Sequence, residues 1–312
     1  FSDFTTSSKW LFNEDRKVLG INICPFDAYK MDAEAIVADA KMTLEALLPA
    51  LAGYKTAYTG EIAAAKAEWE AIVDDYYTKE LPGGLNQTLA LGIINEFMPN
   101  DAIALGSAGS LPGDMQRLFR PKDRGTYHME YGYSCMGYEV ASALGAKIAC
   151  PDQEVYAMCG DGSFDMLHSE LITSVQMGHK INVMLFDNAS FGCINNLQME
   201  HGMDSFGTEF RYRQPETGQL QGGLVPVDFA TIAAGYGCKT WRVTTLDELR
   251  HALDAARRET VSTLIDIKVL PKTMVHKYGS WWNVGVAQTA LSERIRKVAQ
   301  MINEKRAQAR DY

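Results

Sequence analysis

Two polar side chains, Asp161 and Asn188, stand directly after two apolar runs of strand type. One run covers 154–160 and the other covers 181–187. Between them, apolar residues at helical spacing predict a single helix over 163–178. Sixteen helical residues rise about 24 Å, and the seven-residue strand that follows returns about 23 Å. We therefore expect Asp161 and Asn188 side by side at the edge of a parallel sheet where open α/β sheets bind ligands.

The chemistry of this pair favours a hard cation. A carboxylate beside an amide oxygen suits Mg²⁺, which keeps room for ligand phosphates, and the glycine turn at 160–162 opens a predicted helix whose amides would face those phosphates. A structural turn is the alternative, because Gly-Asp-Gly is also common in loops. The loop with Gly109 and Ser110 follows another strand and predicts a second phosphate cradle. It lacks the G-x-G-x-x-G spacing of a dinucleotide site.

Composition limits the class of protein. The 312 residues exceed the usual single domain, and 46% hydrophobic with 22% charged residues is ordinary for a globular protein. The net charge of −9 argues against nucleic acid or an anionic membrane as the main partner. No apolar run approaches the roughly 20 residues of a membrane-spanning helix. The six cysteines show no CxxC spacing and no signal-peptide pattern opens the chain, so we expect reduced thiols and a cytoplasmic location.

The order of predicted elements indicates the fold class. From residue 85 onward, helices and strands alternate, which predicts an α/β fold with a doubly wound, mainly parallel sheet and helices on both faces. The segment 18–27, a predicted strand that runs into a turn, and a predicted helix over 32–51 cannot bury their own apolar surface. We expect them to be the remnant of a second α/β domain. The predicted parts are the end of a middle Rossmann-like domain (1–55), a helical linker (56–84), the main domain (85–270) and a C-terminal tail (271–312).

Within the main domain and the tail, further elements are expected. The predicted helices cover 86–97, 134–147, 228–236 and 246–259, and the predicted strands cover 101–107, 239–244 and 262–269. The helix over 134–147 is apolar nearly all round, so we expect it to be covered on every side and to support self-association. Trp281 and Trp282 in the tail are read as a packing anchor. The start at Phe1 without Met suggests an internal start, as if an N-terminal portion were missing.

Several segments resemble one known family. The pattern GDG followed by DN-x-x-FG, over 160–192, is similar to the signature of thiamine diphosphate-dependent enzymes of the acetolactate-synthase type. YHMEYGYSCMGYEVASALGA (127–146) resembles their GGLGTMGFGLPAAIGA segment, and 20–51 resembles the end of their middle domain. CMGYEVASALGA, FDNASFGCINNLQMEHGMDSFGTEF and TLIDIKVLPKTMVHKYGSWWNVGV are similar to the members that hydrolyse a cyclic 1,2-diketone in myo-inositol catabolism.

The resemblance implies roles for individual residues. Mg²⁺ would be held by Asp161, Asn188 and the carbonyl of Ser190. Met136 would buttress the bent cofactor, and the carbonyl of Ser134 would accept from its aminopyrimidine. The cofactor-binding set that follows is Gly109, Ser110, Ser134, Met136, Gly160, Asp161, Gly162, Ser163, Asn188, Ser190, Phe191 and Gly192.

The implied activity is a thiamine diphosphate- and Mg²⁺-dependent hydrolysis of a carbon–carbon bond, giving 5-deoxyglucuronate from the diketone. Such enzymes take an activating glutamate from the N-terminal, pyrimidine-binding domain of a neighbouring subunit, and no residue here matches it. We therefore expect the carboxyl-terminal half of a homodimer or tetramer, inactive by itself. No catalytic residue is assigned. His128 and Glu130 are candidates for contacting a polyol substrate or relaying a proton, and His201 is a candidate for substrate contact. An acetolactate-synthase-like carboligase and a non-catalytic cofactor-binding module are the alternatives.

Overall fold

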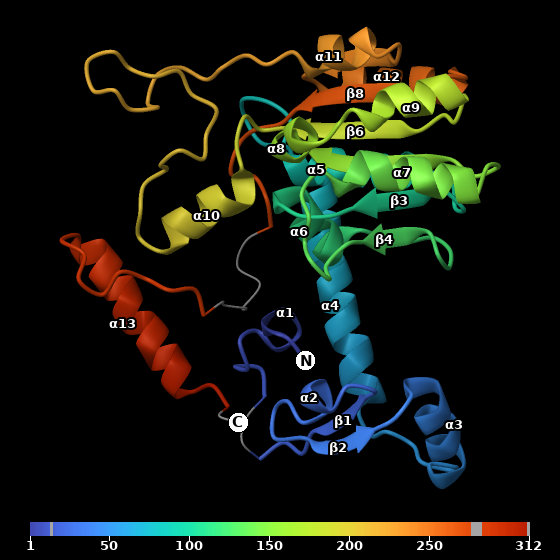
Figure 1. Ribbon diagram of the computed structural model, residues 1–312, viewed down its shortest axis with the longest axis vertical. Coiled ribbons are helices and arrows are strands. Elements are labelled where there is room, and N and C mark those ends of the chain that lie inside the picture. The colour runs from blue at the N-terminus through green and yellow to red at the C-terminus, as the bar shows by residue number, and fades with distance from the viewer. Residues whose placement is uncertain (13–14, 276–282, 311–312) are drawn as a thin grey trace. The chain divides into compact units, whose positions relative to one another are not determined.

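The computed structural model describes residues 1–12, 15–275 and 283–310 (Figure 1). The described chain forms two compact units. The first contains 1–67, 200–203 and the C-terminal residues from 283, and the second contains 68–199 and 204–275. The domain limits expected at 55, 84 and 270 stay a prediction. Trp281 and Trp282 lie outside the described residues.

The second unit is built on a six-stranded sheet in which every pairing is parallel. The strands lie in the order β4-β3-β5-β6-β8-β7. The sequence predicts five of them, and the sixth, β4, was missed because only three residues form it. The strands are β3 (Ile103–Gly106), β4 (Tyr127–Met129), β5 (Val155–Gly160), β6 (Asn182–Asp187), β7 (Lys239–Val243) and β8 (Thr263–Lys268).

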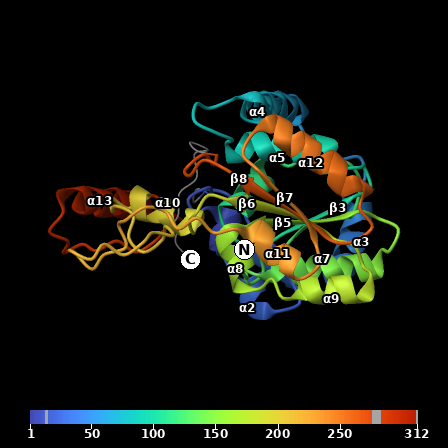
Figure 2. The same cartoon turned by 90° about the horizontal axis from the view of Figure 1, so that it is seen from above.

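Helices cover both faces of this sheet, so the doubly wound prediction is confirmed (Figure 2). Side chains of β6 alternate between the two faces: Val183 and Leu185 join one apolar cluster, and Met184 and Phe186 join the other. One face carries α5 (Gln87–Phe97), α6 (Ser110–Leu118) and α12 (Leu246–Arg258). The opposite face carries α7 (Tyr138–Ala149), α8 (Asp161–Met166), α9 (Glu170–Met177) and α11 (Phe229–Gly235).

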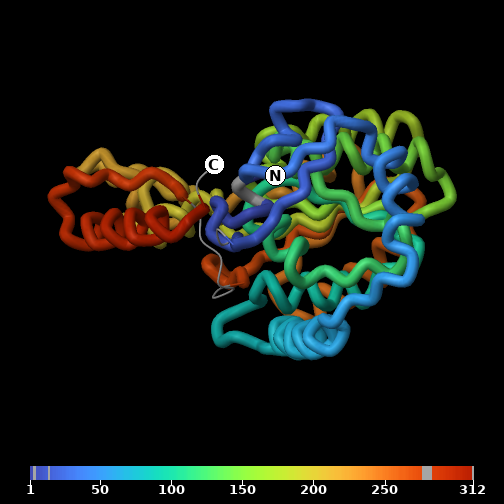
Figure 3. The backbone as a smooth tube through the Cα atoms, turned by 90° about the horizontal axis from the view of Figure 1, so that it is seen from below, coloured from blue at the N-terminus to red at the C-terminus, as the bar shows by residue number. Residues whose placement is uncertain are grey.

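Residues 68–78 of α4 (Thr59–Thr78) belong to the second unit and form an outer layer beside α5, as the views from above and below both show (Figures 2 and 3). Two of its aromatic side chains fix it there. Trp69 Nε1 donates to the Arg117 carbonyl at 3.0 Å, and the Tyr77 hydroxyl donates to the Leu118 carbonyl at 2.7 Å. Gly92 of α5 lies against the Tyr77 ring so closely that a Cβ would be 2.5 Å from it. Only glycine therefore permits this helix contact.

The strand order reverses beside β3. From β3 the chain crosses to β4 on one side and then returns past β3 to β5 on the other side. Such a reversal separates the loops after the two strands and leaves a crevice at their carboxyl ends. The loops that open here begin at Ser107 after β3 and at Asp161 after β5. The topology therefore places a ligand crevice where the sequence predicts Asp161 and Asn188.

Two predicted helices differ from the structure. The single helix expected over 163–178 is wrong, because α8 and α9 are separated at 167–169. A ring nitrogen of His168 lies 2.8 Å from the carbonyl of Phe164 and ends α8, while Leu167 packs against Gly137. The helix expected over 134–147 begins later, at Tyr138, after Gly137 with a φ of 89°. Residue 148 of this helix, an isoleucine, is 48% exposed, so the expected all-round cover is absent within the described chain.

The first unit contains a two-stranded parallel sheet and short helices. The helix expected over 32–51 is wrong in its first part, where 34–37 form a strand. Asp39 accepts from the amide of Met42 at 3.0 Å and so starts the helix later than expected. The elements are α1 (Asp3–Thr6), β1 (Leu19–Asn22), α2 (Pro25–Ala28), β2 (Glu34–Val37), α3 (Ala40–Ala50) and α13 (Glu293–Ala307).

The core of the first unit is small. A cluster of Val18, Met31 and Ala33 is buried, whereas Leu44 and Leu48 of α3 are 55% and 69% exposed, so this unit leaves apolar surface uncovered within the described chain. The C-terminal tail contains the charged helix α13. None of the described helices is both long and apolar enough to cross a membrane.

Candidate cofactor site

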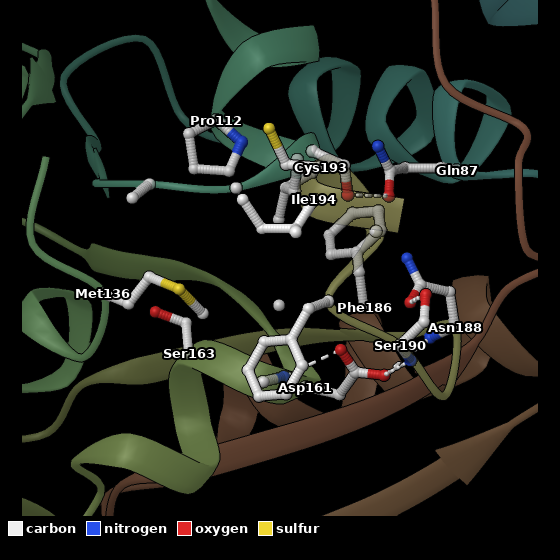
Figure 4. Close-up of a pocket in the computed structure, with 18 of the residues that line it drawn as sticks. Gln87, Pro112, Met136, Asp161, Ser163, Phe186, Asn188, Ser190, Cys193 and Ile194 are labelled. Carbon is white, nitrogen blue, oxygen red and sulfur yellow. Dashed lines mark hydrogen bonds between the residues drawn. The ribbon is translucent and has the colours of Figure 1, made fainter. Parts of the chain in front are cut away.

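A cavity of about 210 Å³ opens at the carboxyl ends of β3, β5 and β6 (Figure 4). Every residue expected to bind the cofactor lines it, namely Gly109, Ser110, Ser134, Met136, Gly160, Asp161, Gly162, Ser163, Asn188, Ser190, Phe191 and Gly192. Gln87, Phe186, Cys193 and Ile194 also line the cavity and were not predicted. The structure thus gathers the set in one place, while the cofactor-binding role of each member stays a prediction.

The expected proximity of Asp161 and Asn188 is confirmed. The backbone amides of Asn188 and Ser190 each donate to Oδ2 of Asp161 at 3.1 Å, and the amide of Gly162 donates to Oδ1 at 2.7 Å. The Ser190 hydroxyl donates to Oδ1 of Asn188 at 2.8 Å. Three backbone bonds therefore fix the carboxylate before any ligand arrives.

The turn after β6 directs its residues towards the cavity. Ala189 has a φ of 54°, and its amide donates to Oδ1 of Asp187 at 2.9 Å. The amide of Phe210 donates to the Ala189 carbonyl at 2.8 Å, which holds the turn from its outer side. Because Ala189 turns the chain sharply, Asn188 and Ser190 both reach the cavity (Figure 4).

Two glycines let the backbone approach the site closely. A Cβ on Gly192 would lie 3.0 Å from both Nδ2 of Asn188 and Oγ of Ser110. A Cβ on Gly162 would lie 2.7 Å from the ring of Phe191. A larger residue at position 192 would press on two polar groups of the cavity wall, and one at position 162 would press on the Phe191 ring, so glycine keeps both walls close together.

The charges beneath the cavity favour a cation. Asp161 is 2% exposed, and burial, followed by the neighbouring Asp187, raises the pKa of its carboxyl well above the usual value. Lys268 bonds Asp187 and also lies 2.8 Å from Asp266. Lys268 thus pairs with two carboxylates, while a third carboxylate, that of Asp161, lines the cavity. A divalent ion there would offset this excess of negative charge.

The donor set fits magnesium. Among the described residues no group of three or more His, Cys, Asp or Glu side chains could hold a metal. A metal in this cavity would therefore rest on one carboxylate, of Asp161, together with neutral oxygens of Asn188 and Ser190. Few protein ligands, all of them oxygen, suit Mg²⁺ that also binds phosphate and water.

A second wall of the cavity comes from the loop after β3. Gly109, with a φ of 116°, precedes α6, whose first residue Ser110 lies 3.4 Å through its Oγ from Oε1 of Gln87. Nε2 of Gln87 donates to buried Asp114 at 2.7 Å. Burial raises the pKa of Asp114 to about 7, and the amide of Val275 also donates to its carboxyl at 2.9 Å. This chain of bonds fixes the wall and was missed at the sequence level, where α6 was not predicted.

The loop that carries Ser134 and Met136 is held from outside the cavity. The carboxylate of Glu130 accepts from the amides of Tyr133 at 2.8 Å and of Cys135 at 2.9 Å. These bonds lower the pKa of Glu130. Ser134 takes a φ of 55° within the loop and lines the cavity together with Met136. Glu130 thus braces the loop and is not itself among the lining residues.

The two candidate histidines belong to other segments of the chain. His128 is exposed on the edge strand β4, and its Nε2 lies 2.8 Å from the carbonyl of Gly125. His201 follows α10 (Gly192–Glu200) and belongs to the first unit. Neither is among the described residues that line the cavity. Their role in substrate contact stays a prediction.

The fold and the cavity define a doubly wound α/β domain with a ligand site at its topological switch. The chain belongs to the thiamine pyrophosphate enzyme family. The family profile described as "Thiamine pyrophosphate enzyme, C-terminal TPP binding domain" matches residues 107–267. This match contains β5, β6 and the cavity residues from 108 to 194, and it confirms the resemblance found in the sequence.

Two curated relatives that share one name are more similar to this chain than the family profile alone shows. The chain is 52% identical over 335 residues to the 3D-(3,5/4)-trihydroxycyclohexane-1,2-dione hydrolase of Geobacillus thermodenitrificans (strain NG80-2), and the match covers 100% of this chain and 52% of that protein. The hydrolase of the same name from Bacillus thuringiensis (strain Al Hakam) is also 52% identical, over 339 residues covering 100% of this chain and 53% of that protein. The chain therefore spans about half the length of the curated relatives it matches.

A solved structure agrees on the fold. The Rhodococcus jostii RHA1 thiamine diphosphate-dependent 4-hydroxybenzoylformate decarboxylase superposes with a TM-score of 0.64, over 84% of this chain and 46% of that chain. The two sequences are 18% identical, so this likeness concerns the fold alone.

Proposed function

We propose that this chain supplies the diphosphate- and magnesium-binding half of an enzyme that hydrolyses trihydroxycyclohexane-1,2-dione at a carbon–carbon bond during myo-inositol degradation. The observation that carries the proposal is the meeting of Asp161, Asn188 and Ser190 at the cavity wall. The curated relatives, at 52% identity, supply the substrate class through their name.

The residues of this chain hold and orient the cofactor. Asp161, Asn188 and the Ser190 carbonyl would bind Mg²⁺, while Gly109 and Ser110, at the start of α6, offer backbone amides that lack partners within a helix. The bound thiamine diphosphate supplies an electron sink for the broken carbon–carbon bond. Met136 presents an apolar side chain to the cavity, which would support the cofactor from one side (Figure 4).

We propose that activation of the cofactor needs a second chain region. The resemblance implies a glutamate from an N-terminal pyrimidine-binding domain, and none of the described residues that line the cavity is a glutamate. Because the chain spans about half of its relatives, the upstream half of such a protein is the source we propose. The isolated chain should therefore bind the cofactor but turn over little substrate.

We also propose a homo-oligomer, as a dimer or a tetramer. Apolar side chains are exposed on α7, α8 and α9, where α7 packs against both of the other helices. These are Tyr138 (39%), Ile148 (48%), Met166 (55%), Ile172 (53%) and Met177 (51%). Apolar patches of this kind commonly mark interaction surfaces. Light scattering over a dilution series tests the proposal, and a monomer at high micromolar concentration would contradict it.

A turnover assay tests the function. The cyclic diketone would be supplied to the purified chain with Mg²⁺ and thiamine diphosphate, alone and mixed with the upstream half of a matching relative. We expect ring opening with the mixture and little without it. Full turnover by this chain alone would refute the need for a second region. Acetolactate formation from pyruvate, without ring opening, would favour the carboligase alternative instead.

A further inference from the structure

A buried glutamate stands behind the cavity. Glu139, in the first turn of α7, is 0% exposed, which is uncommon for a glutamate. Its two carboxyl oxygens lie 2.9 and 2.8 Å from Oγ of Ser163. The amide of Gly137 donates to the same Oγ at 2.8 Å. The described contacts of this carboxyl are thus with a hydroxyl and backbone groups rather than with a basic side chain.

Ser163 connects this glutamate to the cavity. It lines the cavity beside Met136 and follows Asp161 by two positions (Figure 4). A hydroxyl has one proton to donate and two lone pairs that accept. The Gly137 amide donates to one lone pair of the Ser163 oxygen. The protonation state of Glu139 then determines which partners the second lone pair and the hydroxyl proton have. An ionised carboxylate accepts a hydrogen bond from the Ser163 hydroxyl, whereas a protonated carboxyl donates to the remaining lone pair and leaves the hydroxyl free to donate elsewhere.

We propose that protonated Glu139 is a positioning residue that turns the Ser163 hydroxyl proton into the cavity, where it donates to a diphosphate oxygen of the bound cofactor. The inference rests on the proposed function, because it assigns a regulation to the same site. When Glu139 is ionised, the Ser163 proton points away from the ligand and a negative charge faces the diphosphate. Both changes weaken cofactor binding.

The relevant pH range is near neutral. Burial raises the pKa of Glu139 to about 7, so the donating form dominates below this pH and is lost above it. The elements packed against α7 are β3, β5, α8 and α9. Their other titratable side chains, with those of the α8–α9 connection, are Cys159, Tyr156, Asp161, Asp165, His168 and Glu170. Burial raises the pKa of the Cys159 thiol well above its usual value, so this neighbour stays neutral across the range.

A purely structural role makes a different prediction. A carboxylate in the first turn of a helix also favours the helix dipole, and this contribution depends on the ionised form. If Glu139 served only that purpose, its replacement by glutamine would change the stability of the fold and leave the pH profile of cofactor affinity as it is. Affinity at two pH values therefore separates the roles.

The test is a titration of the chain with thiamine diphosphate at saturating Mg²⁺, near pH 6 and near pH 8.5. The wild-type chain, E139Q, S163A and the double variant are compared. The side-chain amide that E139Q introduces donates to Ser163 at either pH. E139Q should therefore match the wild type at the lower pH and bind about tenfold more tightly at the higher pH, the value of one hydrogen bond. Titration of the cofactor and of Asp161 affects both proteins and cancels in this ratio.

S163A provides the matched control, and it keeps the test valid if E139Q fails to fold. It should lose about tenfold in affinity near pH 6 and little near pH 8.5, and it should remove any effect of E139Q in the double variant. Parallel pH profiles for the wild type and either single variant would overturn the inference while leaving the proposed function intact. Absence of binding by the wild-type chain at both pH values would overturn both.

Discussion

The middle of the central sheet and its carboxyl edge are built in different ways by the same strands. In the middle, β5 and β6 bury apolar side chains on both faces, among them Met158 and Leu185. At the edge, the same strands end in buried polar groups, Asp161 and Asp187, and in a turn with Ala189 at positive φ. The middle of each strand thus contributes to the stability of the fold. The end of each strand holds buried polar groups, and the stability of the middle offsets the cost of burying them.

The difference predicts two kinds of response to mutation. A change in the apolar middle should lower the free energy of unfolding and leave cofactor affinity per folded molecule nearly unchanged. A change at the edge should alter affinity or its pH dependence, with a smaller effect on stability. The predictions below start with the largest change in free energy.

The largest expected effect comes from Leu185→Ala in the middle of β6. Leu185 is fully buried under the helices of one face, and truncation of such a leucine removes apolar burial and leaves a cavity. We expect the free energy of unfolding to fall by about 2–5 kcal/mol. Urea denaturation followed by circular dichroism measures it. Leu220→Ala, at a leucine that is 49% exposed, is the control and should change stability by less than about 0.5 kcal/mol.

The next effect concerns pH and buried Asp114. Its pKa in the folded chain, about 7, is above that of the unfolded chain, so its contribution to stability is fully present below the unfolded pKa and is lost as pH rises through 7. The slope is at most about 1.4 kcal/mol per pH unit. Asp114→Asn should flatten the decline in unfolding free energy between about pH 4 and pH 7, measured without cofactor.

The control for this prediction is Asp152→Asn, at an exposed aspartate. It should leave the pH profile of stability unchanged. If Asp114→Asn and Asp152→Asn gave the same profile as the wild type, the carboxyl of Asp114 would be ionised throughout this range. The buried wall of the cavity would then carry a fixed negative charge.

The smallest effect is expected at Ala189. A positive φ costs a non-glycine residue about 1–2 kcal/mol, and glycine removes this cost but adds about 0.4–1 kcal/mol of chain entropy to unfolding. Ala189→Gly should therefore raise stability by about 1 kcal/mol or less, with cofactor affinity kept. Ala141→Gly inside α7 is the contrasting variant and should lower stability by about 1 kcal/mol. A loss of stability in Ala189→Gly would contradict a strained turn.

Much of this arrangement could be predicted from the sequence, because it depends on local pattern. The apolar runs that form β5 and β6 and the polar residues after them, Asp161 and Asn188, lie within one short segment. Their proximity follows from the lengths of the intervening elements. The predicted proximity of Asp161 and Asn188 is correct even though the intervening helix is divided, because α8 and α9 together lead the chain away from this edge and β6 brings it back.

Other features depend on residues far apart in the chain. The helix α6 contains Pro112 and Gly113, which argue for a loop, yet Asp114 within it is fixed by Gln87 and Val275. Glu139 reads as an ordinary acidic residue in the first turn of a helix until Ser163 is placed against it. Such buried acids are defined by their tertiary surroundings, and local pattern could not identify them.

The central claim is that Asp161 anchors a metal-bound cofactor. Calorimetric titration with thiamine diphosphate, with and without Mg²⁺, tests it most directly in the wild type, Asp161→Ala and the control Asp165→Ala, whose exposed side chain is on α8 outside the lining residues. We predict Mg²⁺-dependent binding of thiamine diphosphate in the wild type and the control. At a cofactor concentration of roughly 100 times the dissociation constant, the free energy of unfolding should rise by about 2.7 kcal/mol. Both should disappear in Asp161→Ala. Unchanged affinity in Asp161→Ala would contradict the account.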